Sequence, residues 1–467
     1  MFSPFLNSRK QNAISLVNEL KKSFKYVSIL GTDVKGKYIV KTNNMVRVAE
    51  TFSNECGFVI KATNGKAFFE YSLDDISGDI TNLASKIVNE LKLSYKLECQ
   101  MIDSLDVEEE KLVKSFVRES DFDKYSDSSI LKEIEKINDV LKSKSDKIKA
   151  YQTSINKLDV SKMFVSNNKV LDQNYTWVNG TIVAFYFDNG KFVEGFDHAY
   201  SNNVKDVLDS LPTKIDSLMH RLDRLTLATP IKPGVYDVIT DASITGLIAH
   251  EAFGHGVEMD QFVKDRALAK KYMNKYVASK ITNMKDGAAS GFSTASYFFD
   301  DDGVLATDTQ IIKDGILVSG ICDLTSSREL NVNPTANGRR ESYKRKSYTR
   351  MTNTFIEAGN DKLDDMIKSI KHGYFLFQTN NGMEDPKNWQ IQCTAEYGIE
   401  IVDGKLTDNY VSPVVMSGNV LDLLKSITMI SDEFEIEGAG SCGKGYKEWV
   451  RVSSGGPNLK ARVKLSW

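Results

Sequence analysis

The hydrophobic pattern of the first hundred residues alternates between helical and strand spacing. Apolar residues recur three and four positions apart between residues 16 and 24, which predicts a helix. A second amphipathic helix is expected over residues 80–93. Between them lie short runs typical of strands, at 26–30, 38–41, 46–51, 57–62 and 67–71. We therefore expect residues 1–103 to form an α+β domain with helices packed on an antiparallel sheet.

The pattern continues as an α+β region over residues 104–231. Apolar positions predict a long helix over residues 130–141, capped by Ser128 or Ser129, and a second helix over 204–225. Strand-like runs lie between the two helices, at 150–158, 163–165 and 177–187. The turn formed by Lys232, Pro233 and Gly234 marks the start of a third domain, 232–467, which we expect to be rich in strands. The predicted fold class is α+β.

The amino-acid composition indicates a globular protein and gives no sign of a nucleic-acid partner or a membrane span. The chain has 467 residues, of which 41% are hydrophobic and 26% charged, as in globular proteins. A net charge of -3 gives no reason to expect a nucleic-acid partner, and no apolar run reaches the roughly 18 residues that a membrane span needs. Five scattered cysteines fit free thiols in a reducing compartment, so we expect a cytoplasmic location without membrane association.

A candidate metal site begins on the segment 241–260. Asp241 or Ser243 can cap a helix that delivers His250, Glu251 and then His255. Two histidines five residues apart point about 140° away from each other on a regular α-helix. Both reach one metal only if a π-bulge realigns them, or if the helix ends at Gly254 and His255 turns back.

Cys442 is the best third ligand in the sequence. It lies in the glycine-rich segment 437–445, expected to be a loop, whereas His198, His220 and His372 have no other ligand type near them. Two histidines and a thiolate, with one position open for water, suit a catalytic zinc ion, although iron and cobalt are also compatible. Glu251, beside a ligand, is placed to accept a proton from that water.

Other readings of the same residues stay open. Cys442 could instead be a nucleophile with a histidine partner, in a reaction indifferent to chelators. The segment 438–444 also fits a phosphate-binding loop, but no Ser or Thr follows its lysine. The basic run 339–350 is expected to be a solvated or active-site loop, and its Tyr343, Tyr348 and Arg350 are candidates to stabilise an oxyanion.

The motifs together resemble the TldD/PmbA family, described as modulators of DNA gyrase and as zinc metallopeptidases. The resemblance rests on HEAFGHGVEMD at 250–260, RES at 340–342, RMTNT at 350–354, SCGK at 441–444 and GGPNL at 455–459. It implies that His250, His255 and Cys442 hold zinc and that Glu251 is the catalytic base. It also implies an α+β N-terminal region followed by a β-rich metallopeptidase domain.

The resemblance further implies a substrate and a partner. Family members hydrolyse unfolded peptides or modified-peptide precursors in an enclosed cavity, and a catalytic subunit pairs with a paralogous one that has lost the metal motif. This chain resembles the catalytic kind and is expected to form a homodimer or such a heterodimer. The alternative is a non-catalytic peptide-binding or assembly subunit. Residues 380–392 depart from the family pattern, with Trp389 and few glycines.

Overall fold

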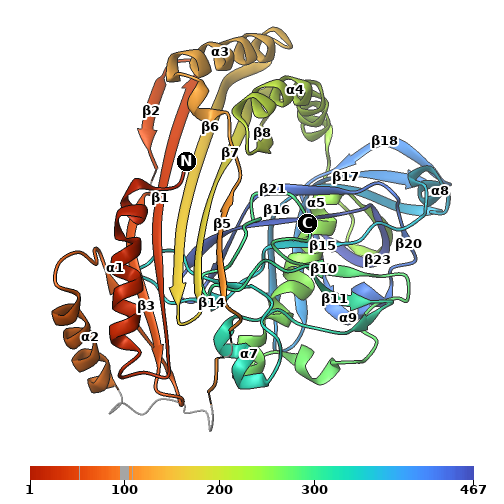
Figure 1. Ribbon diagram of the computed structural model, residues 1–467. Helices are drawn as coiled ribbons and strands as arrows, with labels where there is room; N and C mark the ends of the chain where they lie inside the picture. The colour runs from red at the N-terminus through yellow and green to blue at the C-terminus, as the bar shows by residue number, and fades with distance from the viewer. Residues whose placement is uncertain (52, 95–104, 108) are drawn as a thin grey trace.

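The computed structural model describes residues 1–51, 53–94, 105–107 and 109–467. Figure 1 shows a tall N-terminal sheet with helices packed on it, beside a more irregular C-terminal half. The helices are α1 (Pro4–Leu20), α2 (Ile80–Ser94), α3 (Asp127–Ser143), α4 (Val204–Leu227), α5 (Ala242–Leu247), α6 (Met259–Val263), α7 (Leu324–Leu330), α8 (Leu363–Lys368) and α9 (Val420–Lys425). The shorter or wider turns are η1 (Phe122–Lys124), the π-helix η2 (Ile248–Gly254), η3 (His255–Val257) and η4 (Leu268–Tyr272).

The N-terminal sheet has the strand order β4-β3-β1-β6-β7-β5, with β2 beside β1 and β8 beside β7. Its strands are β1 (Tyr26–Thr42), β2 (Val46–Glu50), β3 (Glu55–Thr63), β4 (Phe68–Leu73), β5 (Leu112–Val117), β6 (Ile148–Ser166), β7 (Lys169–Asp188) and β8 (Lys191–Ser201). Because β1 pairs with β6, the regions expected before and after residue 103 share one sheet. That expected boundary falls outside the described residues, and the three-domain division stays a prediction.

Successive side chains of a strand point to opposite faces of the sheet, so alternate residues pack into two different hydrophobic cores. On β1, Ile29 faces the helices α1 and α2, while its neighbour Leu30 packs with Phe164 and Phe299. Further along the same face as Ile29, Ile39 packs with residues of α3 and α4. The sheet is therefore covered by helices on one face and by the C-terminal half on the other (Figure 1).

The C-terminal half contains two larger sheets and a small one. The first has the order β12-β11-β10-β15-β22-β21, the second the order β16-β9-β23-β19-β17-β18 with β20 beside β23, and β13 pairs with β14. The strands are β9 (Gly234–Thr240), β10 (Met284–Asp286), β11 (Thr309–Lys313), β12 (Ile316–Leu317), β13 (Gly338–Arg339), β14 (Tyr348–Thr349), β15 (Asn353–Ile356), β16 (His372–Asp385), β17 (Gln390–Val402), β18 (Lys405–Val411), β19 (Val414–Asn419), β20 (Met429–Ile430), β21 (Glu435–Lys444), β22 (Glu448–Gly456) and β23 (Leu459–Ser466). The α+β class and the β-rich C-terminal region are confirmed.

The core of the C-terminal half lies around η2. Ile248, Ala252 and Phe253 of η2 belong to one large cluster of buried apolar residues. The same cluster takes in Cys442 and Val452 from the first sheet and residues of β16 and β17 from the second. The turn that carries the candidate ligand His250 and leads into His255 is thus held between the two sheets.

Some expected elements differ from those observed. The runs 26–30 and 38–41 belong to the single strand β1, and 150–158 and 163–165 to the single strand β6. The cap of α3 is neither Ser128 nor Ser129, because the side chain of Ser126 accepts the hydrogen bond from the Ser129 amide. None of the described helices combines the length and the apolar character that crossing a bilayer requires.

Candidate metal centre

Asp241 starts the helix that leads to the candidate ligands. Its Oδ1 accepts a hydrogen bond from the Ile244 amide at 2.9 Å, so Asp241, and not Ser243, is the N-terminal cap of α5. Its Oδ2 accepts a second one from the Gln378 amide of β16 at 2.8 Å. One carboxylate therefore both begins the helix and ties it to the neighbouring sheet.

His250 and His255 lie at the two ends of a π-helical turn. Residues 248–254 form η2, and the His255 amide donates to the carbonyl of His250, five residues back. Of the two arrangements expected from the spacing of the two histidines, the structure has the π-helical one. Gly254 permits it, because a Cβ at this position would lie 2.1 Å from Sδ of the buried Met351.

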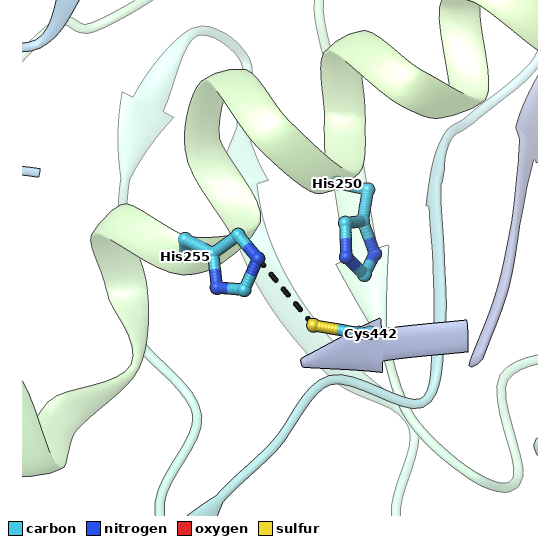
Figure 2. Close-up of side chains that lie close together, drawn as sticks. All are labelled: His250, His255 and Cys442. Atoms are coloured by element: carbon cyan, nitrogen blue, oxygen red, sulfur yellow. Dashed lines mark hydrogen bonds between the residues drawn. The ribbon is translucent and has the colours of Figure 1, made fainter. Parts of the chain in front are cut away.

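Cys442 approaches the histidines from β21. The segment 437–445 is not the expected loop: most of it is strand, with an irregular register between Glu437 and Gly440, and Cys442 pairs with Val450 of β22. Figure 2 shows both imidazole rings converging on the sulfur, with Sγ 3.4 Å from Nε2 of His255. One ligand atom from each of the three residues lies within 4.8 Å of the others.

The charges around Cys442 favour a thiolate. Burial opposes its ionisation, but His250 and His255 lower the pKa of Cys442 to about 4. Nδ1 of His250 is buried without a hydrogen-bond partner among the described residues. A thiolate beside two imidazoles, one with an unsatisfied nitrogen, is a donor set that fits a soft or borderline divalent cation.

Glu251 faces the same point from the π-helical turn. Its two carboxylate oxygens lie 3.9 Å from Nε2 of His250 and 3.9 Å from Nε2 of His255. Burial raises the pKa of Glu251, which suits a group that accepts and returns a proton. Gly382 of β16 allows the close approach, since a Cβ there would lie 2.8 Å from Cγ of Glu251.

A second layer of charged groups holds His255, and the sequence analysis missed it. Nδ1 of His255 lies 3.2 Å from Glu258, whose carboxylate also accepts from Lys444 at 3.0 Å. Lys444 donates in addition to Asp260 at 2.9 Å. A carboxylate behind a ligating histidine fixes the ring and raises its basicity. Glu258, Asp260 and Lys444 all lie within the quoted motifs, two to five residues from a candidate ligand.

The candidate centre opens into a cavity of about 1170 Å³. Its walls include Phe196 and His198 of β8, Trp449 of β22 and Glu384 of β16. Both carboxylate oxygens of Glu384 are buried without partners in the described part of the chain, and burial raises the pKa of Glu384 to about 9. Glu384 lies in the segment 380–392 that departs from the family pattern, and its role in the cavity was not predicted.

Other residues that the sequence singled out lie elsewhere. His372 lies 3.0 Å from Glu400, and His220 is exposed on α4. The hydroxyl of Tyr343 donates to Asp74 of the N-terminal region, and the guanidinium of Arg350 is buried against the Cys442 carbonyl. The basic run 339–350 is therefore not one solvated patch. The phosphate-loop pattern fails as expected, because β21 turns directly into β22.

Similar proteins are known by sequence. Residues 233–464 match a family model described as the PmbA/TldA metallopeptidase C-terminal domain. A metalloprotease of Methanothermobacter thermautotrophicus is 31% identical over 240 residues, which cover 51% of this chain and 52% of the relative. A Synechocystis metalloprotease is 30% identical over 328 residues, 70% of each chain. A zinc metalloprotease TldD homolog of Saccharolobus solfataricus is 31% identical over 261 residues, 56% of each. The chain thus matches only about half the length of the first relative.

Solved structures share the fold. A Thermotoga maritima protein described as a candidate modulator of DNA gyrase superposes with a TM-score of 0.78 at 15% identity, covering 99% of this chain and 100% of its own. TldE from Thermococcus kodakarensis gives 0.77 at 15% identity, covering 97% and 99%. At this identity the likeness shows the architecture of nearly the whole chain and nothing about its chemistry.

Proposed function

Because this chain belongs to the PmbA/TldD family of metallopeptidases, we propose that it is a zinc-dependent peptidase centred on His250, His255 and Cys442. The observation that carries the proposal is the convergence of these three ligand atoms within 4.8 Å, beside a carboxylate. A closed structural zinc site uses four Cys or His ligands, whereas three ligands leave a position open. A purely structural zinc site would also not require the Glu251 carboxylate beside its ligands.

The residues around the proposed zinc have separate tasks. Zinc in such a site supplies Lewis-acid activation of water and of a carbonyl group. Glu251 accepts a proton at its carboxylate and returns it to the leaving amine. Glu258 holds the His255 ring through Nδ1, and Lys444 neutralises Glu258. The cavity walls hold the peptide beside Glu251 and exclude bulk water.

Substrate, partner and location belong to the same proposal. We infer that the substrates are unfolded peptides or modified-peptide precursors, since a cavity of about 1170 Å³ takes an extended segment and not a folded domain. The assembly is a homodimer or a heterodimer with a paralogous subunit, which the shared fold of TldE supports. The location is the cytoplasm, in keeping with free thiols at Cys56, Cys322, Cys393 and Cys442. Cys99 lies outside the described residues.

Metal content and peptide cleavage together test the proposal. Wild-type protein purified without chelators should contain about one zinc ion per chain, and Cys442→Ala should contain much less. Cys56→Ser, at an exposed thiol away from the centre, is the matched control. Glu251→Gln should keep its zinc and lose cleavage of unstructured peptides. Zinc-loaded wild type that cleaves no peptide in a broad screen would favour the non-catalytic subunit instead.

The low pKa of Cys442 also favours a second candidate function, a cysteine peptidase. A thiolate 3.4 Å from the His255 ring resembles a nucleophile with its basic partner. The two candidates differ in their response to chelators. Cleavage that survives removal of the metal, but not Cys442→Ala, would establish the thiol mechanism and exclude the zinc one.

A further inference from the structure

A second cavity, of about 990 Å³, lies between the N-terminal sheet and the hairpin β21–β22. Tyr175 and Trp177 of β7 line one side of it, and Arg451 of β22 lines the other. Val450 pairs with Cys442, so its neighbour Arg451 points to the opposite face of the hairpin, away from the sulfur. The side chain of Trp449 lines both cavities, which makes them neighbours around one edge of the hairpin.

Two hydrogen-bond donors that line this second cavity have no acceptor in the described part of the chain. The guanidinium of Arg451 has no hydrogen bond or ion pair there, although its backbone pairs with Ser441, and the hydroxyl of Tyr175 has no hydrogen bond. Nε1 of Trp177 is buried without a partner, in a side chain that is only 1% exposed. That nitrogen is sealed from the cavity, whereas Arg451 and Tyr175 line it. The guanidinium of Arg451 and the hydroxyl of Tyr175 can therefore contact a group that enters the cavity.

Arg118 is a further cation near Tyr175, and its guanidinium packs against the rings of Trp177, Phe292 and Phe298. Its guanidinium carbon lies 5.0 Å from the centre of the Trp177 ring, and its Nη1 is buried without a partner in the described chain. Burial lowers the pKa of Arg118 and of Arg451, and the nearby Tyr175 hydroxyl opposes this in both. Arg118, which follows β5, and Arg451 of β22 therefore approach the same tyrosine from different parts of the chain.

The other cations that line the cavity are already engaged. Lys162 pairs with Asp301, and Arg340 lies 3.0 Å from Glu70. Arg339 donates to the Met351 carbonyl at 2.6 Å. Among the carboxyls, burial and the charge of Asp302 raise the pKa of Asp300 well above its usual range. Arg339 has this carbonyl partner but no ion pair, whereas the guanidinium of Arg451 has neither among the described residues.

We propose that this cavity binds the carboxylate group of a peptide, with Arg451 as the main cationic contact and the hydroxyl of Tyr175 as a hydrogen-bond donor. A guanidinium with a neutral donor beside it matches the planar geometry and single charge of a carboxylate. A more highly charged phosphate is disfavoured by Glu55 and Asp301, which also line the cavity. That the carboxylate belongs to a peptide rests on the proposed peptidase function, since Trp449 lines both this cavity and the one that contains Glu251.

Binding of short peptides to zinc-loaded Glu251→Gln protein tests the inference without consuming the ligand. Three peptides labelled at the N-terminus are compared by fluorescence anisotropy: a free acid, its C-terminal amide, and the amide with one internal glutamate. The free acid should bind about tenfold more tightly than the plain amide. Arg451→Met should abolish this preference, and Arg47→Met, at an exposed arginine of β2, should keep it.

The third peptide identifies the source of the carboxylate. Tight binding of the internal glutamate peptide assigns the site to acidic side chains, and weak binding assigns it to the C-terminus. Tyr175→Phe removes one unpartnered hydroxyl and should reduce the preference roughly threefold in a fold that is barely changed. It replaces Arg451→Met as the test if that variant does not fold.

Equal affinity for all three peptides, or a preference that survives Arg451→Met, overturns the inference. Its failure is distinguishable from failure of the proposed function. If the wild type cleaves peptides but the Glu251→Gln protein binds the free acid and the amide equally well, only the carboxylate site is disproved. An Arg451-dependent preference in a protein that never cleaves a peptide disproves only the peptidase.

Discussion

The buried guanidinium of Arg350 donates a hydrogen bond to the main-chain carbonyl of Cys442. Its other terminal nitrogen donates to the Glu448 carbonyl across the hairpin at 3.1 Å. The side chain is only 1% exposed, so it acts as an internal clamp that holds β21 and β22 in register at the candidate ligand. The oxyanion role considered for Arg350 is therefore less suitable than a positioning one.

Arg350→Lys should loosen this clamp. A lysine ammonium is a single point donor and cannot span both carbonyls, which leaves a buried acceptor unsatisfied. We expect a loss of about 1–3 kcal/mol in the free energy of unfolding, measured by denaturant titration. Zinc content should fall as well, because the strand that carries Cys442 moves. Arg47→Lys on exposed β2 is the control, and unchanged stability with full zinc content would contradict the clamp.

Gly254→Ala should disrupt the π-helical turn. The added methyl carbon would lie 2.1 Å from Sδ of Met351, so η2 or Met351 must shift. We expect reduced zinc occupancy and a destabilisation of roughly 1–3 kcal/mol, as for overpacked cores. Gly418→Ala is the matched control, because a Cβ there meets nothing within 4 Å. Equal zinc content in the two variants would mean that the close contact at Gly254 is unimportant.

Glu258→Gln should weaken metal binding without removing a ligand. The amide oxygen can still accept from Nδ1 of His255, but the negative charge that faces His255 and Lys444 is lost. Substitution behind a ligating histidine typically lowers metal affinity about 10- to 100-fold. Competition with a chelator of known affinity measures this, with Glu433→Gln at an exposed position as the control. An affinity within twofold of wild type would show that Glu258 does not support the centre.

Carboxylate binding in the second cavity should weaken as the pH rises from 6 to 8. Burial raises the pKa of Glu55 to about 7, although Lys162, the Tyr343 amide and Arg340 oppose this and Asp301 adds to it. Glu55 is thus neutral below pH 7 and charged above it, while a peptide carboxylate stays charged throughout. Repulsion of about 1 kcal/mol between partly hydrated charges corresponds to roughly fivefold weaker binding at pH 8.

Glu55→Gln separates this effect from other titrations. The amide oxygen can keep the hydrogen bond from the Tyr343 amide, which lies 3.0 Å from Glu55, but it cannot acquire charge. The variant should bind the free-acid peptide equally well at pH 6 and pH 8. A wild-type affinity that does not change over this range would count against a role for Glu55.

The features that could be predicted from the sequence depend on residues that lie close together along the chain. The five-residue spacing of His250 and His255 restricted the backbone to two arrangements, and the π-helical turn is the one observed. The contact of Lys444 with Glu258 joins residues 186 apart, which no local pattern reveals. The donors of the second cavity were missed for the same reason, since Tyr175 and Arg451 meet only through the packing of two sheets.

The long strands show the same limit. Residues 26–30 and 38–41 read as two runs because polar residues lie between them. In the fold, the intervening Asp33 accepts a hydrogen bond from Ser3 at 2.5 Å, and Lys37 lies 2.5 Å from Asp127 of α3. Partners that are distant in sequence satisfy these polar side chains, so β1 continues through them.

The distance along the chain between His255 and Cys442 has a consequence for biosynthesis. A ribosome delivers the chain from its N-terminus, so His250, Glu251 and His255 emerge long before Cys442, which follows His255 by 187 residues. The strand β23, which lies between β9 and β19, is made later still. A nascent chain therefore carries two histidines and a glutamate without the sulfur opposite them. Whatever chemistry the centre performs begins only after translation has passed residue 442, so a chain under synthesis cannot act on the unfolded polypeptides around it.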